Sequence, residues 1–104
     1  MFDFSILKAK FNNVEQINPS KIRVNNELIE VLEYLKNTPE FDFDMLTSIV
    51  AIDLKDNIEL IYQLISTKTS ETLYISYICK NYTAPSVIKV YSSAYFDECE
   101  IFDL

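Results

Sequence analysis

The 104-residue sequence contains no glycine, and this absence restricts both the turns and the functional sites that the chain can form. A phosphate-binding P-loop, a dinucleotide-binding Rossmann turn and a nucleophile elbow all need glycine at defined positions. The sequence therefore excludes these sites. Turns that need a positive φ must use other residues, of which Asn and Asp tolerate the left-handed conformation best.

The chain also contains no histidine, so it lacks the commonest general base and the commonest metal ligand. Its two cysteines, Cys79 and Cys99, are too few for a disulfide scaffold, and alone they cannot hold zinc or an iron–sulfur cluster. We expect both to be reduced thiols. The sequence predicts no catalytic residue, no metal ligand and no cofactor site.

Size and charge narrow the class of protein further. Hydrophobic residues make up 49% of the chain, as in an ordinary globular protein, and residues 1–104 are expected to form one domain. The net charge of −7 argues against binding to nucleic acid or to an anionic membrane, and fits either a solvated surface or a docking face for a basic partner protein. The apolar runs fall short of the ~20 residues that span a bilayer, and the first residues do not resemble a signal peptide. We therefore expect a cytoplasmic protein without direct membrane insertion.

The clearest predicted element is a helix over residues 27–36. We expect Asn25 or Asn26 to cap its start, and Thr38 followed by Pro39 to end it. Its apolar residues follow the i, i+3, i+4, i+7 spacing of a single stripe: Leu28, Val31, Leu32 and Leu35.

Five segments have the composition and alternation of strands: residues 14–17, 21–24, 44–53, 58–66 and 72–79. In the turn at 54–57 we expect Asp56 or Asn57 to adopt the left-handed conformation. Apolar residues occupy both faces of the last strand, so we expect a second surface to cover the sheet.

Helical patterns stand at both ends of the chain. A short first helix has Asp3 or Ser5 as its candidate N-cap, a helical turn is predicted after Pro85, and Ser93 is the candidate cap of a last helix from Ala94 to the end. The predicted order is α-β-β-α-β-β-β followed by short C-terminal helices. This is an α+β domain with two layers, a mixed sheet with helices on one face.

Four segments carry a family resemblance, in the same order along the second half of the chain. Residues 41–53 (FDFDMLTSIVAID) are similar to a segment in which a short acidic approach leads to L-T-x-x-x-A-x-D. Residues 61–66 (IYQLIS) resemble V-Y-x-L-x-S, residues 84–87 (APSV) resemble V-P-S-V, and residues 94–104 (AYFDECEIFDL) resemble W-x-E-R-E-x-x-D-[ML]. Together they resemble the thirty-kilodalton subunit family of complex I (NADH:quinone oxidoreductase) and of related membrane-bound [NiFe] hydrogenases.

The resemblance implies a function through partners. Members of this family carry no redox centre and dock on the large catalytic subunit and the iron–sulfur subunit of the complex. The implied role is a non-catalytic assembly subunit of the peripheral arm, on the cytoplasmic side of the inner membrane. Glu98, Glu100 and Asp103 match the three acids of the last motif and are the candidate partner-docking residues, while Cys99 stands where the family has arginine. The chain stops before the C-terminal tail of the family, so we expect a domain without that tail.

Helix geometry separates the three acids. At about 100° per residue, Glu100 and Asp103 share one flank of the last helix, and Glu98 points nearly opposite. A solvated or partner-facing pair is favoured over a metal site or an acid–base pair, since no third ligand is near in sequence.

Two further side-chain predictions concern Cys99 and the acids that precede the third strand. Cys99 shares a helix face with Tyr95 and Phe102 and is expected to be a small buried hydrophobe. Asp42 and Asp44 alternate with phenylalanines, as on a strand edge with one solvated face.

Two other functional classes stay open. One is a free-standing interaction module that self-associates, as a homodimer when isolated, through an open sheet face. The other is a small enzyme that uses the carboxylates of Glu100 and Asp103.

Overall fold

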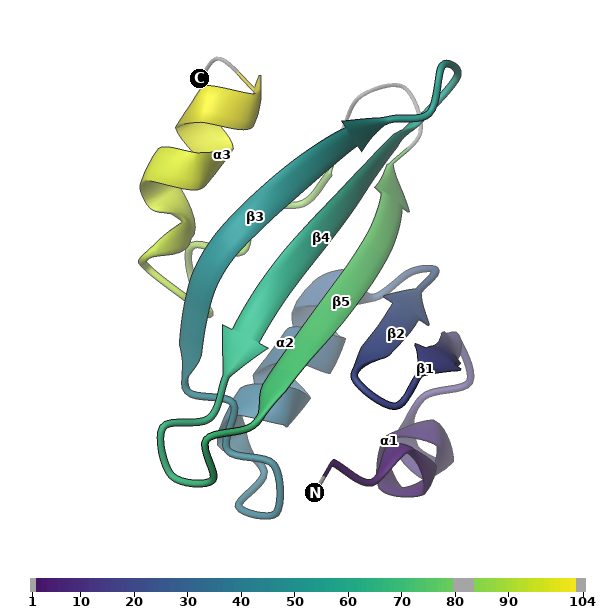
Figure 1. Ribbon diagram of the computed structural model, residues 1–104, viewed down its shortest axis with the longest axis vertical. Helices are drawn as coiled ribbons and strands as arrows, with labels where there is room; N and C mark the ends of the chain where they lie inside the picture. The colour runs from purple at the N-terminus through teal and green to yellow at the C-terminus, as the bar shows by residue number, and fades with distance from the viewer. Residues whose placement is uncertain (1, 80–83, 103–104) are drawn as a thin grey trace.

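The five strands form one mixed sheet in the order β1-β2-β5-β4-β3, in a computed structural model that describes residues 2–79 and 84–102 (Figure 1). The parallel pair is β2 with β5, and the other neighbours are antiparallel. The predicted α+β class and element order are confirmed. The elements are α1 (Phe4–Lys10), β1 (Val14–Asn18), β2 (Lys21–Val24), α2 (Leu28–Asn37), β3 (Met45–Asp53), β4 (Ile58–Ile65), β5 (Thr72–Cys79) and α3 (Ala94–Phe102).

The core lies between α2 and one face of the sheet. In Figure 1 α2 lies behind β4 and β5. The predicted apolar stripe of α2 is buried along its whole length, which confirms the helix and its orientation. It packs into one core with the alternate residues of β4 and β5 that share a sheet face: Leu60, Tyr62, Leu64, Leu73 and Ile75.

The start of α2 differs from the prediction. The N-cap is Glu27, in the left-handed conformation with φ 56°, and its side chain makes no capping hydrogen bond. Asn25 and Asn26 belong to the connection from β2, where the Asn13 side-chain amide donates to the carbonyl of Asn26. The chain has to reverse within a few residues, and this reversal places the unusual backbone angle on Glu27. The predicted end is confirmed, because Thr38 is the C-cap.

The turn between β3 and β4 also differs from the prediction. Lys55, rather than Asp56 or Asn57, has the positive φ of 83°. The Asp53 side chain accepts a hydrogen bond from the Lys55 backbone N–H at 2.8 Å, so the acid stabilises the turn from the neighbouring position.

Residues 41–44 have the predicted alternation of burial without being a strand. Phe41 and Phe43 are buried, but the backbone turns at Asp42, where φ is 50°, and β3 begins only at Met45. Asp44 accepts hydrogen bonds from the backbone N–H and the hydroxyl of Thr67, at 2.9 and 2.6 Å. These bonds lower the pKa of Asp44, whose carboxylate ties the β4–β5 turn to the start of β3.

The opposite face of the sheet, turned toward the viewer in Figure 1, is left open by the described helices. A charged cluster crosses it. Ser76 donates to the Glu59 carboxylate at 2.5 Å, and the side-chain nitrogens of Lys21 and Arg23 lie 3.8 Å from the same carboxylate. Half-buried apolar residues from β4 and β5, namely Ile61, Ile65, Tyr74 and Ile78, surround this cluster. The second covering surface inferred from the sequence therefore stays a prediction.

Candidate functional site

The last helix, α3, is attached to β3 by polar contacts with the β3 backbone. The Asp97 carboxylate accepts a hydrogen bond from the backbone N–H of Ile49 at 3.0 Å, and the Ser93 hydroxyl donates to the carbonyl of Leu46 at 2.9 Å. The contacts flank the point where the β3–β4 register shifts, between Leu46 and Ser48. The N–H of Ile49 is free for this contact because β3 is the last strand in the sheet order and pairs with β4 on one side only. Ser93 is thus placed next to the helix as predicted, but its hydroxyl holds the strand.

Asp97 was not identified from the sequence as a structural residue. Its partner lies 48 residues away, and no local pattern marks such a contact. The available signal was weak: an acid in the first turn of a helix is also explained by the helix dipole.

Glu98 lies inside the protein. It is 3% exposed, and its carboxylate accepts hydrogen bonds from the Ser86 hydroxyl and from the Val87 backbone N–H, both at 2.7 Å. Burial, with the nearby Glu98 charge as a second cause, raises the pKa of Tyr62. The sequence predicts Glu98 as a docking residue, and the structure corrects this: Glu98 fastens the segment before α3 to the helix.

The outer side of α3 exposes two aromatic rings. Phe96 is 79% exposed and Tyr95 is 51% exposed. Their ring centroids lie 5.3 Å apart in an edge-to-face arrangement. Cys99 is only partly buried, so the prediction that it is a buried hydrophobe is wrong. The reason is that α3 is a helix at the margin of the sheet, packed on one side only.

Of the other two predicted docking acids, the structure describes one. Glu100 is exposed on α3, and Asp103 lies outside the described residues. The helix geometry agrees with the prediction that Glu98 and Glu100 point different ways.

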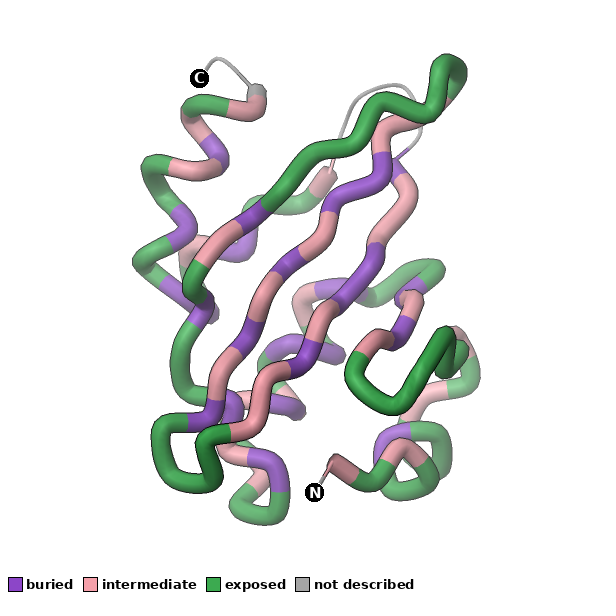
Figure 2. Tube along the Cα trace, viewed as in Figure 1, coloured by how far each residue is buried: buried purple, intermediate pink, exposed green. Residues whose placement is uncertain are grey.

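The second half of β3 is exposed on both of its faces. Residues 50–53 and the following turn form a continuous exposed run, green along the upper part of β3 in Figure 2. Val50 is 50% exposed, and Ile52 and Leu54 are exposed as well. We use "α3–β3 surface" for the exposed side chains on these two neighbouring elements and at the start of the turn after β3: Val50, Ile52, Leu54, Tyr95, Phe96 and Glu100.

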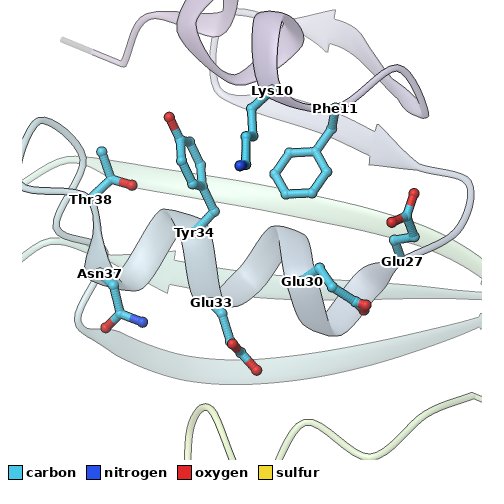
Figure 3. A pocket seen from close by; sticks show the side chains of 8 residues that line it. All are labelled: Lys10, Phe11, Glu27, Glu30, Glu33, Tyr34, Asn37 and Thr38. Carbon is cyan, nitrogen blue, oxygen red and sulfur yellow. The ribbon is translucent and has the colours of Figure 1, made fainter.

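A shallow groove of about 440 Å³ lies elsewhere, between the end of α1 and α2 (Figure 3). Lys10 and Phe11 point from α1 toward α2, and the Lys10 ammonium lies 6.0 Å from the centre of the Tyr34 ring. Glu33 and Asn37 point away from the Phe11 and Tyr34 rings. The lining of this groove combines the Phe11 and Tyr34 rings with charged and polar side chains.

The described part of the chain contains one buried and one half-buried cysteine, and both are free thiols. Cys79 is buried, as predicted, and burial raises the pKa of its thiol, which makes it an unreactive core residue. Among residues 2–79 and 84–102, no three His, Cys, Asp or Glu side chains gather as a metal site would require.

The family follows from a direct comparison. The model of the family "Respiratory-chain NADH dehydrogenase, 30 Kd subunit" matches residues 22–104, which is most of the chain. The chain belongs to this family. The resemblance seen in the four sequence motifs is thereby confirmed, and the matched range includes β3, α3 and all three candidate docking acids.

Curated relatives of this 30 Kd subunit family member agree. The chain is 31% identical over 81 residues to an NADH-quinone oxidoreductase subunit of Rickettsia prowazekii (strain Madrid E), covering 74% of this chain and 41% of the relative. The same subunit of Rickettsia felis (strain ATCC VR-1525 / URRWXCal2) is 31% identical over 83 residues, covering 76% of this chain and 40% of the relative. The chain therefore spans about two fifths of the length of the relatives it matches.

A solved structure shares the fold of this family member. A chain in the structure of the membrane-bound sulfane sulfur reductase, an archaeal respiratory membrane complex, superposes with a TM-score of 0.75 at 20% sequence identity. The match covers 96% of this chain and 64% of the other. At this identity the likeness shows the common fold. Within the described residues, no helix is both long and apolar enough to cross a bilayer.

Proposed function

We propose that this 30 Kd subunit family member is a non-catalytic assembly subunit of a complex I-type electron-transfer complex. It docks on the large catalytic subunit and the iron–sulfur subunit through the α3–β3 surface. The proposal applies to a complex of either the NADH:quinone oxidoreductase or the [NiFe] hydrogenase type. Its place is on the cytoplasmic side, peripheral to the inner membrane through these partners.

The observation that carries the proposal is the exposure of Phe96. Phe96 is 79% exposed, so its ring buries little apolar surface within its own chain. Buried interface cores are enriched in aromatic residues, and these residues supply much of the binding energy. Phe96 forms a pair with Tyr95 on a helix that is itself anchored by Asp97 and Glu98. Such a pair on a fixed helix can enter a partner pocket with little loss of conformational entropy.

Charge supports a basic partner at the same surface. Glu100 is exposed near the end of α3, where the helix dipole disfavours an acid by about 0.3–1 kcal/mol. The net charge of −7 adds to this unfavourable potential. Lys or Arg of a partner subunit would relieve both effects, and Asp103 is proposed to act together with Glu100.

The residues of the chain support a role without chemistry of its own. The sequence has no histidine, the commonest general base, and no glycine, which excludes a P-loop and a nucleophile elbow. Electron transfer in the proposed complex belongs to the partner subunits.

Co-purification of the tagged chain with the large and iron–sulfur subunits tests the proposal. We expect wild type to co-purify with both, Phe96→Ser to lose most of the complex, and Glu100→Gln with Asp103→Asn to weaken it most at low salt. Lys89→Gln, an exposed change outside the α3–β3 surface, is the matched control and should behave as wild type.

Thermal melts of the free variants separate docking from folding. Phe96→Ser and the double acid variant should melt within a few degrees of wild type, because Phe96 and Glu100 are exposed. If wild type does not associate with either subunit, or if the double acid variant unfolds the free domain, the docking role is wrong.

A second candidate function is self-association through the open sheet face. The half-buried Ile61, Ile65, Tyr74 and Ile78 on that face favour it. The cluster of Lys21, Arg23 and Glu59 in their midst opposes it, since burying charges on both copies costs desolvation energy. Sedimentation velocity of the isolated chain distinguishes the two, with a monomer expected for the assembly subunit.

A further inference from the structure

The two edge strands of the sheet, β1 and β3, differ in how their outer sides are protected. At the β1 edge the ammonium of Lys8 donates to the carbonyls of Asn12 and Val14, at 3.1 and 2.9 Å. Four of the five β1 residues are exposed, and polar side chains predominate. A lysine bound to a polar edge is one of the devices by which proteins prevent further strands from pairing there.

The hydrogen-bond register shows which β3 groups face the other edge. The Leu54 N–H donates to the Asn57 carbonyl at 2.8 Å, which closes the β3–β4 hairpin. In an antiparallel ladder such bonded pairs recur every second residue, so Ile52 and Val50 bond to β4. The N–H and C=O groups of Ile49, Ala51 and Asp53 therefore point away from β4.

At Ile49 the structure confirms that the backbone N–H points away from β4. The outward N–H of Ile49 is occupied by the Asp97 carboxylate. Ala51 and Asp53 lie one and two steps further along the same edge, within the run where all side chains are exposed. Both residues thus belong to the exposed run of β3, drawn green in Figure 2, on the last strand of the sheet order.

Apolar side chains accompany these backbone groups. Val50 and Ile52 share the open face of the sheet, because alternate residues of a strand point to the same side. A strand added beside β3 would place its own alternate side chains against both. An exposed apolar edge of this kind is normally avoided unless it has a partner.

We propose that the free edge of β3, residues 50–54, pairs with an extended segment of a partner subunit, which adds a sixth strand to the sheet. The inference rests on the assembly function proposed above and names the contact. The segment bonds to the backbone of Ala51 and Asp53 and stops before Ile49, where Asp97 already fills the donor. It carries apolar residues at alternate positions, for Val50 and Ile52, and Lys or Arg at the end that meets the hairpin turn.

Charge complementarity selects this occupant. Asp53 and Asp56 are exposed at the turn, and Glu100 is exposed on the neighbouring α3, against a single exposed Lys55. A basic segment is attracted to this end of the strand. A second copy of the chain would instead bring two such acidic turns and two net charges of −7 together.

Hydrogen exchange and one pair of variants test the inference on the complex with the large and iron–sulfur subunits. The amides of Ala51 and Asp53 should exchange rapidly in the free chain and at least about tenfold more slowly in the complex, because strand addition buries and bonds them. Ala51→Pro removes the outward N–H at an edge position that tolerates proline, and should weaken complex formation about tenfold. Ala51→Thr keeps the N–H and should assemble like wild type.

The outcomes separate the edge contact from the general function. If wild type assembles but the two amides exchange as in the free chain, or a folded Ala51→Pro assembles like wild type, the edge pairing is wrong and the docking function stands. If Ala51→Pro fails to fold, the exchange of the wild-type amides decides. If wild type does not assemble, the proposed function fails and the edge pairing with it. Protection of the same amides in the isolated chain, together with a dimer mass, would overturn the inference in favour of a second copy.

Discussion

At the scale of single residues, three neighbouring acids of one helix have different environments. Asp97 bonds to the β3 backbone, Glu98 is buried against the preceding segment, and Glu100 faces solvent. The difference follows from the helical advance of about 100° per residue. An inward carboxylate is tolerated only where donors meet it, and Glu98 has two, the Ser86 hydroxyl and the Val87 N–H. The three carboxylates on this helix therefore have different roles.

Glu98→Ala should reduce the free energy of unfolding by about 1–3 kcal/mol, because it leaves the Val87 N–H without its acceptor in a buried site. Glu100→Ala, two residues along the same helix, is the matched control and should change stability by less than about 0.5 kcal/mol. Urea unfolding monitored by circular dichroism measures both. Equal losses in the two variants would mean that Glu98 is not the anchor of this segment.

Leu32→Ala should cost about 2–5 kcal/mol, since Leu32 is fully buried in the middle of the α2 stripe. Against the total of about 5–15 kcal/mol for a typical domain, this lowers the unfolding midpoint clearly. Glu33→Ala, exposed on the next position of α2, serves as the control in the same thermal and urea experiments. A loss below about 0.5 kcal/mol for Leu32→Ala would contradict the packing of α2 on the sheet.

At the scale of elements, the absence of glycine is visible in how the elements are joined. Glu27, Asp42, Lys55 and Ser70 all have positive φ, and each lies at a turn or a helix start. A side chain with a Cβ in this conformation costs about 1–2 kcal/mol. Local hydrogen bonds offset part of this, as where Asp53 accepts from the Lys55 N–H. The β3–β4 hairpin and the β2–α2 connection are thus short, and each contains a residue with a strained backbone, Lys55 and Glu27.

At the start of α2, glycine substitutions at two nearby positions should change the stability in opposite directions. Glu27→Gly should stabilise the protein by up to about 1 kcal/mol, because glycine adopts the left-handed N-cap conformation without a steric penalty. Glu30→Gly, the same substitution three residues later inside the helix, should destabilise it by about 1 kcal/mol. Thermal unfolding of both variants gives the comparison. A loss of stability in Glu27→Gly would show that the Glu27 side chain contributes more than its backbone strain costs.

At the scale of the whole molecule, the sheet separates an internal face from an open face, and its margins carry the exposed apolar residues. The core is complete without the α3–β3 surface: the buried cluster runs from Leu7 through α2 and the sheet to Ala94. Phe96, Val50 and Ile52 lie outside this buried cluster and keep much of their apolar surface exposed in the isolated chain. The net charge of −7 is complementary to the basic partner surface proposed above.

The purified chain is expected to contain no stoichiometric metal, flavin or nucleotide. The reason is chemical: glycine and histidine are absent, and Cys79 is buried in the core. Elemental analysis and an absorption spectrum of the protein, purified without chelator, make the measurement. A metal at one equivalent, or a visible chromophore that survives dialysis, would contradict a role without chemistry of its own.

The class of fold and most of its elements follow from local patterns in the sequence. The stripe of α2 and the alternation in β4 and β5 are local patterns, and burial on one side is sufficient to produce them. The backbone angles at the turns were missed, because the residue that takes the positive φ depends on how far the chain must reverse between packed elements. The roles of the acids on α3 were only partly foreseen for the same reason: spacing shows that Glu98 and Glu100 point apart, but not which of them faces the core. That choice, like the contact of Asp97 with Ile49, is made when α3 packs beside β3, and it depends on partners that lie far away in the chain.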